Sequence, residues 1–309
     1  MIRIGIDLGG TNIAVGAVDD GHAIVSRVSV PTLARRPAAE VVGDMGDAVE
    51  AALAKAGLSI GDCRSIGIGS PGTCDSANGV VVRAYNLGWF NVPVCSMVTA
   101  RLGLPCRLSN DANCAALAET VAGGAVGCRN MILITLGTGV GGGIVADGQL
   151  LEGVGGTGAE VGHTVLVLDG EDCTCGRKGC WEAYASATAL IRQGKRAAAA
   201  QPESLLAGYG EGLTGKDVFD AAAAGDAAAQ AVVDRYCVYV AAGITDLVNI
   251  LGPEKVLIGG GISRQGERLL APIRAYVAAN CFGGHDRTPP VIECARLGNE
   301  AGIIGAAAL

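Results

Sequence analysis

A short cysteine-rich loop constrains the possible folds of this chain more than any other feature of its sequence. Cys173, Cys175 and Cys180 form a Cys-x-Cys-x4-Cys pattern, and His163 precedes it by ten residues. Three thiolates and one imidazole nitrogen are the ligands of a closed tetrahedral zinc site, and closed zinc sites have structural roles. The alternative is a group of buried cysteines that pack as small apolar side chains. The spacing predicts a structural Zn²⁺ bound by these four residues.

The residues around this loop favour zinc over buried thiols. Residues 176–179 have the sequence Gly-Arg-Lys-Gly, which interrupts any helix or strand and brings positive charge that favours thiolates. Glu160 and Glu182 flank the pattern, and a carboxylate is a hard ligand in a site of soft donors. We therefore expect these two glutamates to contact a substrate rather than the metal.

Length and composition narrow the class of protein. A chain of 309 residues is expected to form two domains, and a hydrophobic share of 50% with only 4% aromatic residues predicts helices packed closely on sheets. The net charge of -7 argues against nucleic acid as a partner, because phosphate backbones are bound by clustered Lys and Arg. Any bound phosphate must then be held by backbone N–H groups, a metal or a few local cations.

Cysteine usage and hydropathy predict a soluble, cytoplasmic protein with no membrane partner. Most of the 12 cysteines are scattered singly through apolar stretches, which indicates a reducing compartment. The chain begins with a strand pattern rather than a signal peptide. Its longest apolar segment, residues 231–251, contains Asp234, Arg235 and Asp246, which argue against a membrane span.

The pattern of apolar residues predicts strands that alternate with helices. Val42, Met45, Val49 and Leu53, for example, recur at helical spacing before Gly57. The expected strands cover residues 2–7, 12–18, 23–30, 65–69, 106–109, 131–136, 143–146, 255–259 and 290–294. The expected helices cover residues 38–56, 94–102, 112–122, much of 186–251, and the end of the chain from 299.

A repeated strand-loop-strand pattern indicates an internal duplication. Residues 7–12 and 135–140 both place a glycine-rich loop between two apolar strands. The two halves are therefore expected to be similar α/β units that face each other across a cleft. We expect a small N-terminal domain of residues 1–122 plus 290–309, to which the last helix returns, and a large domain of residues 123–289 with the zinc loop.

Three glycine motifs are candidates for phosphate or nucleotide binding. Residues 7–11, Asp-Leu-Gly-Gly-Thr, end a strand with backbone N–H groups and a carboxylate that suit phosphate and water-bound Mg²⁺, although an ordinary hairpin has the same pattern. Residues 137–142 match G-x-G-x-x-G, but a strand follows, which excludes a dinucleotide site. Residues 259–261 suit either a tight turn or a surface for the flat ring of a ligand.

Residues 109–113, Ser-Asn-Asp-Ala-Asn, join a buried strand to a helix. Asn and Asp are favoured as helix N-caps, which is the structural interpretation. Polar residues at the carboxyl end of a strand also project into the ligand crevice of an α/β fold. A carboxylate there can accept the proton of a sugar hydroxyl that attacks phosphorus.

These motifs together resemble the ROK family of bacterial sugar kinases. In chain order they are Asp7-Leu8-Gly9-Gly10-Thr11, Ser70-Pro71-Gly72, Asn86-Leu87-Gly88-Trp89, Asn110-Asp111, Gly137-Thr138-Gly139, Glu160-x-Gly-His163 with the cysteine loop, and Gly259-Gly260-Gly261. The resemblance covers nearly the whole chain, and the cysteine loop beside Glu160-x-Gly-His163 is its most specific part. It implies an α/β, actin-like (ribonuclease H-like) ATPase fold with two domains flanking a cleft.

The resemblance also implies a homodimeric hexose kinase that uses ATP and Mg²⁺ to phosphorylate the sugar 6-hydroxyl, with a tetramer as the alternative assembly. Asp111 would be the general base, and His163 would bind zinc through one ring nitrogen and the sugar through the other. The implied sugar-binding residues are Gly69, Asn86, Asn110, Asp111, Glu160, His163 and Glu182. The implied nucleotide-binding residues are Asp7, Gly9, Gly10, Thr11, Asn12, Gly137, Thr138, Gly139, Gly259, Gly260 and Gly261.

Glucose is the expected substrate, because the stretch at 180–186 is similar to that of family members that act on glucose. N-acetylglucosamine, N-acetylmannosamine, mannose and fructose are the alternatives. The family also contains sugar-binding repressors, but these carry a helix-turn-helix segment ahead of the kinase-like part, and here the first motif begins at residue 7. A silent sugar sensor and a polyphosphate-dependent kinase are less favoured, the latter because it would need a basic groove.

Overall fold

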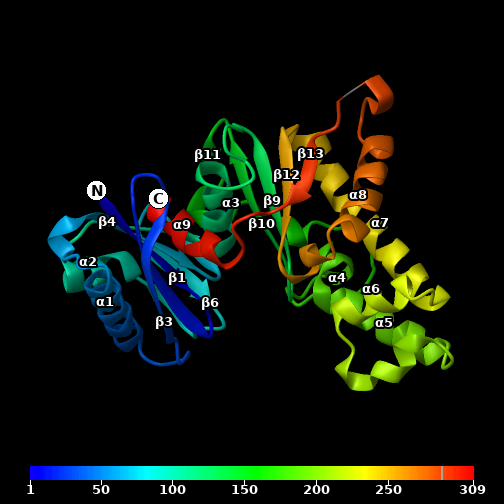
Figure 1. The fold of residues 1–309 in the computed structure, drawn as a ribbon, viewed down its shortest axis with the longest axis horizontal. Helices are drawn as coiled ribbons and strands as arrows, with labels where there is room; N and C mark the ends of the chain where they lie inside the picture. The colour runs from blue at the N-terminus through cyan, green and yellow to red at the C-terminus, as the bar shows by residue number, and fades with distance from the viewer. Residues whose placement is uncertain (287) are drawn as a thin grey trace. The chain divides into compact units, whose positions relative to one another are not determined.

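The computed structural model describes residues 1–286 and 288–309, whose elements are labelled in Figure 1. The strands are β1 (Ile2–Leu8), β2 (Asn12–Val18), β3 (Ile24–Pro31), β4 (Cys63–Ser70), β5 (Thr73–Asp75), β6 (Val80–Ala84), β7 (Trp89–Val92), β8 (Cys106–Asn110), β9 (Met131–Leu136), β10 (Val140–Ala146), β11 (Gln149–Leu150), β12 (Lys255–Gly259) and β13 (Val291–Cys294). The α-helices are α1 (Ala38–Lys55), α2 (Val94–Leu102), α3 (Asp111–Val121), α4 (Glu182–Ala185), α5 (Ala187–Ala200), α6 (Gly215–Ala223), α7 (Ala227–Leu251), α8 (Glu267–Asn280) and α9 (Ala301–Ala308).

The expected strands and helices are present, with small shifts at their ends. β10 begins at Val140 rather than 143, so the preceding glycine loop is shorter than expected. The helical region expected over 186–251 consists of α5, α6 and α7. The sequence analysis missed the small sheet β5-β6-β7, whose strands have only 3, 5 and 4 residues and therefore show little periodicity.

The two large sheets have corresponding strand orders. The first is β3-β2-β1-β4-β8, and the second is β11-β10-β9-β12-β13. In the first, β1 pairs antiparallel with β2 and parallel with β4, which pairs parallel with β8. In the second, β12 likewise lies parallel between β9 and β13. The matching orders agree with the internal duplication that the repeated strand-loop-strand pattern predicts.

The described chain forms two compact units. The first contains residues 1–129, 143–159 and 296–309, and the second contains residues 130–142 and 160–295. The sequence analysis expected the chain to change domains at 122/123 and 289/290 and did not separate residues 143–159. These residues belong with the first unit because Gly143 lies against α3: a Cβ there would be 2.6 Å from the carbonyl oxygen of Ala112.

Helix α9 lies against the first sheet and α3 at glycine contacts, and Figure 1 shows it beside β1. A Cβ at Gly5 of β1 would lie 1.9 Å from the carbonyl oxygen of Ile303, and one at Gly67 of β4 would lie 1.7 Å from that of Ala306. A Cβ at Gly305 would lie 1.7 Å from the carbonyl oxygen of Cys114 in α3. Because a Cβ never approaches a carbonyl oxygen so closely, these positions must be glycine for the helix to pack here.

The long helix α7 has defined signals at both ends. The side chain of Asp226 accepts a hydrogen bond of 2.8 Å from the N–H of Ala229, and Gly252 ends the helix with a φ of 54°. Asp234, Arg235 and Asp246 lie within it. Among the described residues, no helix is both long enough and apolar enough to cross a lipid bilayer.

We predict opposite effects for two glycine-to-alanine substitutions in the first unit. Gly67→Ala should lower the free energy of unfolding by about 3 kcal/mol or more, because its Cβ would displace α9. Gly43→Ala should raise it by about 0.5–1 kcal/mol, because Gly43 lies inside α1 and no described atom would be within 4 Å of the new Cβ. Urea unfolding measures both values, and destabilisation by Gly43→Ala would contradict the packing argument.

Candidate active site

Two carboxylates, Asp7 and Asp111, are electrostatically coupled in the first unit. Asp7 is the penultimate residue of β1, and Asp111 is the first residue of α3. Burial and, to a lesser extent, the charge of Asp111 raise the pKa of Asp7 from 3.8 to about 6. A Cβ at Gly302, just inside α9, would lie 2.4 Å from an oxygen of Asp7, so α9 closes one side of this carboxyl group. A carboxyl group whose pKa is raised by burial and by a second carboxylate is typical of sites that bind a cation or move a proton.

The loop between β1 and β2 is a tight turn with an exposed tip. The N–H of Gly9 donates to the carbonyl of Asn12 over 2.9 Å, and the hydroxyl of Thr32 donates to the carbonyl of Gly9 over 2.7 Å. Thr11 and Asn12 are exposed. The side chain of Asn86 packs against Gly10, where a Cβ would lie 3.1 Å from its amide nitrogen. The fold therefore brings two of the motifs identified in the sequence into contact.

Asn110 caps α3, which is the structural interpretation of this motif, and it also contacts the residues after β4. Its Oδ1 caps α3 by accepting the N–H of Ala112 over 2.8 Å, and its Nδ2 donates to the carbonyl of Gly72 over 3.0 Å. The side chain therefore links α3 to the residues after β4. Asp111 follows with an exposed carboxylate, one oxygen of which accepts the N–H of Ala112. Gly69 also belongs to this group, because a Cβ there would be 3.8 Å from the Cα of Asp111.

Sequence reasoning missed two residues beside Asp111. Glu152 accepts hydrogen bonds from the hydroxyls of Ser76, over 2.8 Å, and of the buried Ser109, and so fixes the end of β8. Asn113 is buried in the first turn of α3, and its Oδ1 has no hydrogen-bond partner among the described residues. The position of Asn113 near a helix start gave no sign that its amide oxygen is buried without a partner among the described residues. Glu152 carries no local motif at all.

In the second unit, Glu182 connects the glycine loop 137–139 to the cysteine loop. One oxygen of Glu182 accepts the N–H of Val140 over 3.0 Å, and the other accepts the hydroxyl of Thr174 over 3.0 Å. A Cβ at Gly139 would lie 2.3 Å from the first oxygen, so only glycine fits there. The hydroxyl of Thr188 donates to the carbonyl of Thr138, whose own side chain is exposed. The loop is thus held by α4 and α5.

The four expected zinc ligands lie together. Their donor atoms are all within 4.8 Å of one another. The Sγ atoms of Cys175 and Cys180 are 3.7 Å apart, and Cys173 Sγ is 3.6 Å from His163 Nδ1. A tetrahedral zinc with Zn–S of about 2.3 Å and Zn–N of about 2.05 Å places two sulfurs about 3.8 Å apart and a sulfur about 3.6 Å from a nitrogen. The donor set and its spacing therefore fit a closed zinc site.

The backbone explains why this loop has the sequence that it does. Gly176 and Gly179 have φ values of 87° and 76°, and a Cβ at Gly179 would be 1.8 Å from the carbonyl oxygen of Val167. The loop ends at the fully buried Trp181, whose indole N–H donates to the carbonyl of Tyr239 in α7 over 2.8 Å. The cysteine loop is therefore anchored to the core of the second unit.

His163 is positioned by a close backbone approach. It ends the 3-10 turn Val161–His163, and a Cβ at Gly162 would lie 2.2 Å from the carbonyl oxygen of Val140. The glycine of Glu160-x-Gly-His163 is therefore needed to bring the turn against β10. Nδ1 of His163 faces the cysteines, which leaves Nε2 for another partner. Glu160 is exposed at the start of the same turn.

The glycine motif 259–261 has a structural requirement of its own. Gly260 has a φ of 84°, and a Cβ there would lie 2.4 Å from the carbonyl oxygen of Leu136 at the end of β9. A 3-10 turn, Gly261–Gln265, follows before α8. The tight turn is thus present, and Gly260 and Gly261 are exposed beside it.

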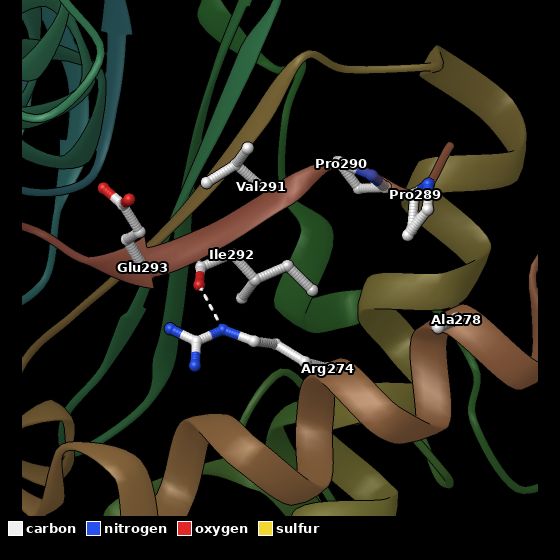
Figure 2. A pocket seen from close by; sticks show the side chains of 7 residues that line it. All are labelled: Arg274, Ala278, Pro289, Pro290, Val291, Ile292 and Glu293. Atoms are coloured by element: carbon white, nitrogen blue, oxygen red, sulfur yellow. Dashed lines mark hydrogen bonds between the residues drawn. The ribbon is translucent and has the colours of Figure 1, made fainter. Parts of the chain in front are cut away.

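A cavity of about 470 Å³ in the second unit contains none of these residues. Figure 2 shows it between β13 and α8, lined by Pro289, Pro290 and Val291 on one side and Arg274 on the other. Nε of Arg274 donates to the carbonyl of Ile292 over 2.8 Å (Figure 2), so this arginine covers the edge of the sheet. We assign it no role in chemistry.

Comparison with known proteins connects these groups to one family. The family model described as the ROK family matches residues 3–309. The chain is 41% identical to a glucokinase of Halalkalibacterium halodurans, with 98% of this chain and 92% of the relative covered, and 41% identical to a glucokinase of Streptomyces coelicolor, with 100% and 97% covered. The crystal structure of a ROK family glucokinase from Streptomyces griseus in complex with glucose and AMPPNP superimposes with a TM-score of 0.81 at 38% identity, covering 100% of this chain and 98% of that one.

We predict that Asp7→Asn stabilises the folded protein at neutral pH. A raised carboxyl pKa means that the ionised form destabilises the folded state, so this cost is absent below about pH 4 and complete above about pH 6. Without ligands or divalent cations, Asp7→Asn should raise the free energy of unfolding by about 1–3 kcal/mol at pH 7.5, allowing for partial exposure, and leave it unchanged at pH 4. Urea titrations at both pH values measure this, with the exposed Asp47→Asn as control. Equal effects at the two pH values would refute it.

Proposed function

Because the chain belongs to the ROK family, we propose that it is an ATP-dependent hexose kinase that phosphorylates the 6-hydroxyl of glucose. The observation that carries the proposal is the exposed carboxylate of Asp111 at the N-terminus of α3, next to the half-buried carboxyl of Asp7. The 41% identity to glucokinases over nearly the whole chain supports glucose as the sugar. The AMPPNP and glucose bound to the Streptomyces griseus enzyme support ATP as the donor.

In the proposed mechanism, Asp111 accepts the proton of the 6-hydroxyl as its oxygen attacks the terminal phosphorus of ATP. Asp111 suits this role because its carboxylate is exposed while its backbone is fixed by the Asn110 cap. Phosphoryl transfer depends on positioning and charge rather than on covalent chemistry by the protein. Asn86, Asn110 and Gly69 are proposed to orient the sugar, together with Glu160, His163 and Glu182.

The nucleotide is proposed to bind the glycine loops. The exposed Thr11, Asn12 and Thr138, with the neighbouring backbone N–H groups, would hold phosphate oxygens. Asp7 would hold Mg²⁺ through water, and the ion would neutralise charge on the donor phosphates. An ionised Asp7 beside Asp111 is electrostatically costly, and a cation in that place would relieve the cost. Gly259, Gly260 and Gly261 are proposed to border the adenine.

The zinc site is proposed to be structural and to act on the sugar through His163. Cys173, Cys175, Cys180 and Nδ1 of His163 would complete a tetrahedron, which leaves no position for substrate. The metal would supply rigidity to the loop and fix the ring orientation of His163, so that Nε2 is presented to a sugar hydroxyl. The homodimer that the family resemblance implies is also proposed here, on that resemblance alone.

The test of the proposed function is a panel of sugars with ATP and Mg²⁺. We expect kcat/KM for glucose to exceed that for mannose, fructose, N-acetylglucosamine and N-acetylmannosamine by at least tenfold. Asp111→Asn should lower kcat by about 10²–10⁴-fold, the usual contribution of a general base, and leave glucose affinity within about threefold. The exposed carboxylate variant Asp47→Asn is the control.

The outcomes of this panel separate the parts of the proposal. Preference for an acetamido sugar would keep the mechanism and reject glucose. Near-normal turnover by Asp111→Asn would reject the base assignment, and no turnover on any sugar would reject the kinase in favour of a sugar sensor.

A second prediction concerns the zinc ligands. Cys175→Ser should lose zinc, measured by metal analysis, and weaken glucose binding about 10- to 100-fold, because His163 loses its fixed orientation. Binding is measured by calorimetry without ATP, so that the result does not depend on catalysis. Cys128→Ser, which changes a half-buried thiol outside the zinc group, should retain both zinc and affinity. Full glucose affinity in zinc-free Cys175→Ser would show that sugar binding does not depend on the metal, which would contradict the prediction.

A further inference from the structure

A positively charged cavity in the first unit contains none of the residues proposed to act on sugar, nucleotide or zinc. Its volume is about 410 Å³, which is in the range of small-molecule sites. Four basic side chains line it: Arg3, His22, Arg64 and Arg107. The rest of the described lining consists of uncharged side chains, among them those at the end of α9. The basic groups therefore set the electrostatic character of the cavity.

The fold brings the three arginines to one edge of the first sheet. Arg3 is the second residue of β1, Arg64 is the second of β4, and Arg107 is the second of β8. These strands are neighbours in the order β1-β4-β8 and run parallel, so their first residues share an edge. Asp7 and Asn110 lie at the other ends of their strands. The arginines are therefore gathered at the edge away from the proposed catalytic residues.

The protein does not fully neutralise these arginines. Arg107 donates to the carbonyl oxygen of Leu309 at the end of α9, and a terminal carboxylate there would balance this one charge. Nη2 of Arg3 lies 3.6 Å from Oδ1 of Asp20, whose Oδ2 is 2.6 Å from the N-terminal ammonium. Arg64 is exposed and makes no hydrogen bond or ion pair with any described residue, although the more distant charge of Asp20 acts on it. Positive charge therefore remains at the cavity after the structural roles of the arginines are counted.

The remaining positive charge matches the chemistry of phosphate. The whole chain has a net charge of -7, so a cluster of arginines with no acidic side chain in the described lining runs against its composition. A guanidinium group donates parallel N–H groups to phosphate oxygens and keeps its charge at any physiological pH. A bound anion would also relieve the repulsion among the guanidinium groups. The cavity is larger than one phosphate group, and Pro105, Val121 and Ala307 provide apolar surface for an organic part.

We propose that this cavity is a binding site for a phosphate-bearing small molecule. Arg3 and Arg64 pair with the phosphate oxygens, and Arg107 adds positive charge from the end of α9. Free phosphate and a phosphorylated organic compound offer the same group to the guanidinium groups, and their affinities tell them apart. The site lies at the edge of the sheet opposite to Asp7 and Asp111, and it does not depend on the proposed kinase activity.

The test is calorimetric titration of the full-length protein with three probes: inorganic phosphate, pyrophosphate and ribose 5-phosphate. Ribose 5-phosphate carries an organic part and is not a product of hexose phosphorylation. Without nucleotide or Mg²⁺ and at low salt, we expect at least one probe to bind with a Kd below about 1 mM. Tightest binding of ribose 5-phosphate would assign the site to a phosphorylated compound, and tightest binding of either inorganic probe would assign it to the free anion. Affinity should fall about fivefold or more between about 50 and about 300 mM NaCl, because salt screens the arginines.

Matched variants locate the bound probe. Arg64→Gln should weaken the tightest probe about tenfold or more, because charge-assisted hydrogen bonds to phosphate are lost. Its Tm should stay within about 2 °C of the wild type, because the side chain has no described partner to lose. Arg27→Gln removes an exposed guanidinium of the same unit, 3.5 Å from Glu300, and should leave affinity within about twofold. Thr138→Ala, in the proposed nucleotide site, should have equally little effect.

Two results would overturn the proposal. A Kd above about 10 mM for all three probes would show that the cavity does not select phosphate. Unchanged affinity in both Arg64→Gln and Arg3→Gln would place the bound probe elsewhere in the protein, and a loss confined to Thr138→Ala would place it in the nucleotide site. Sugar turnover is not measured, so failure of the proposed kinase function would not affect the result.

Discussion

The close approach of α9 to the first sheet and to α3 is the constraint on which the first unit depends. Three backbone carbonyls occupy the space that side chains at Gly5, Gly67 and Gly305 would fill. The helix therefore lies within backbone contact distance of β1, β4 and α3 at once. That contact brings the end of β1, with Asp7, next to the start of α3, with Asp111. Burial in this place and, to a lesser extent, the charge of Asp111 raise the pKa of Asp7.

In the second unit, a carboxylate side chain rather than a helix connects the loops of the site. Glu182 follows the cysteine loop and accepts hydrogen bonds from both that loop and the start of β10. The glycine loop, the cysteines and His163 are thereby connected by hydrogen bonds and sulfur contacts. The proposed zinc would hold these parts together more firmly. Nδ1 of His163 lies beside the cysteines, and the neighbouring Gly162 packs against the backbone of β10. The same residues are proposed to serve both the metal and the sugar, so changes to one are expected to affect the other.

Much of the fold could be predicted from local patterns. Apolar periodicity located the strands of both large sheets except β11, and most helices, and the repeated glycine loops indicated the duplication that the matching strand orders support. Spacing in the sequence also predicted that His163, Cys173, Cys175 and Cys180 lie together. The small sheet β5-β6-β7 was missed because its strands are too short to show a period. Glu152 and Asn113 were missed because their significance comes from distant partners or from the lack of one, and neither appears in local sequence.

The sequence by itself determined the residue types that the proposed chemistry needs and the order in which they occur: the carboxylate at the end of β1, the Asn-Asp pair at the start of α3, the glycine loops and the cysteine pattern. Short-range propensities and ligand preferences are sufficient for these, because they depend on residues close together in the chain. Only the tertiary structure decided which groups meet. Residues 143–159 join the first unit, and the chain returns to that unit at residue 296 rather than 290, because these contacts depend on backbone packing between segments far apart in the chain. The raised pKa of Asp7 also depends on the tertiary structure, since its burial and its neighbouring charge exist only in the folded protein.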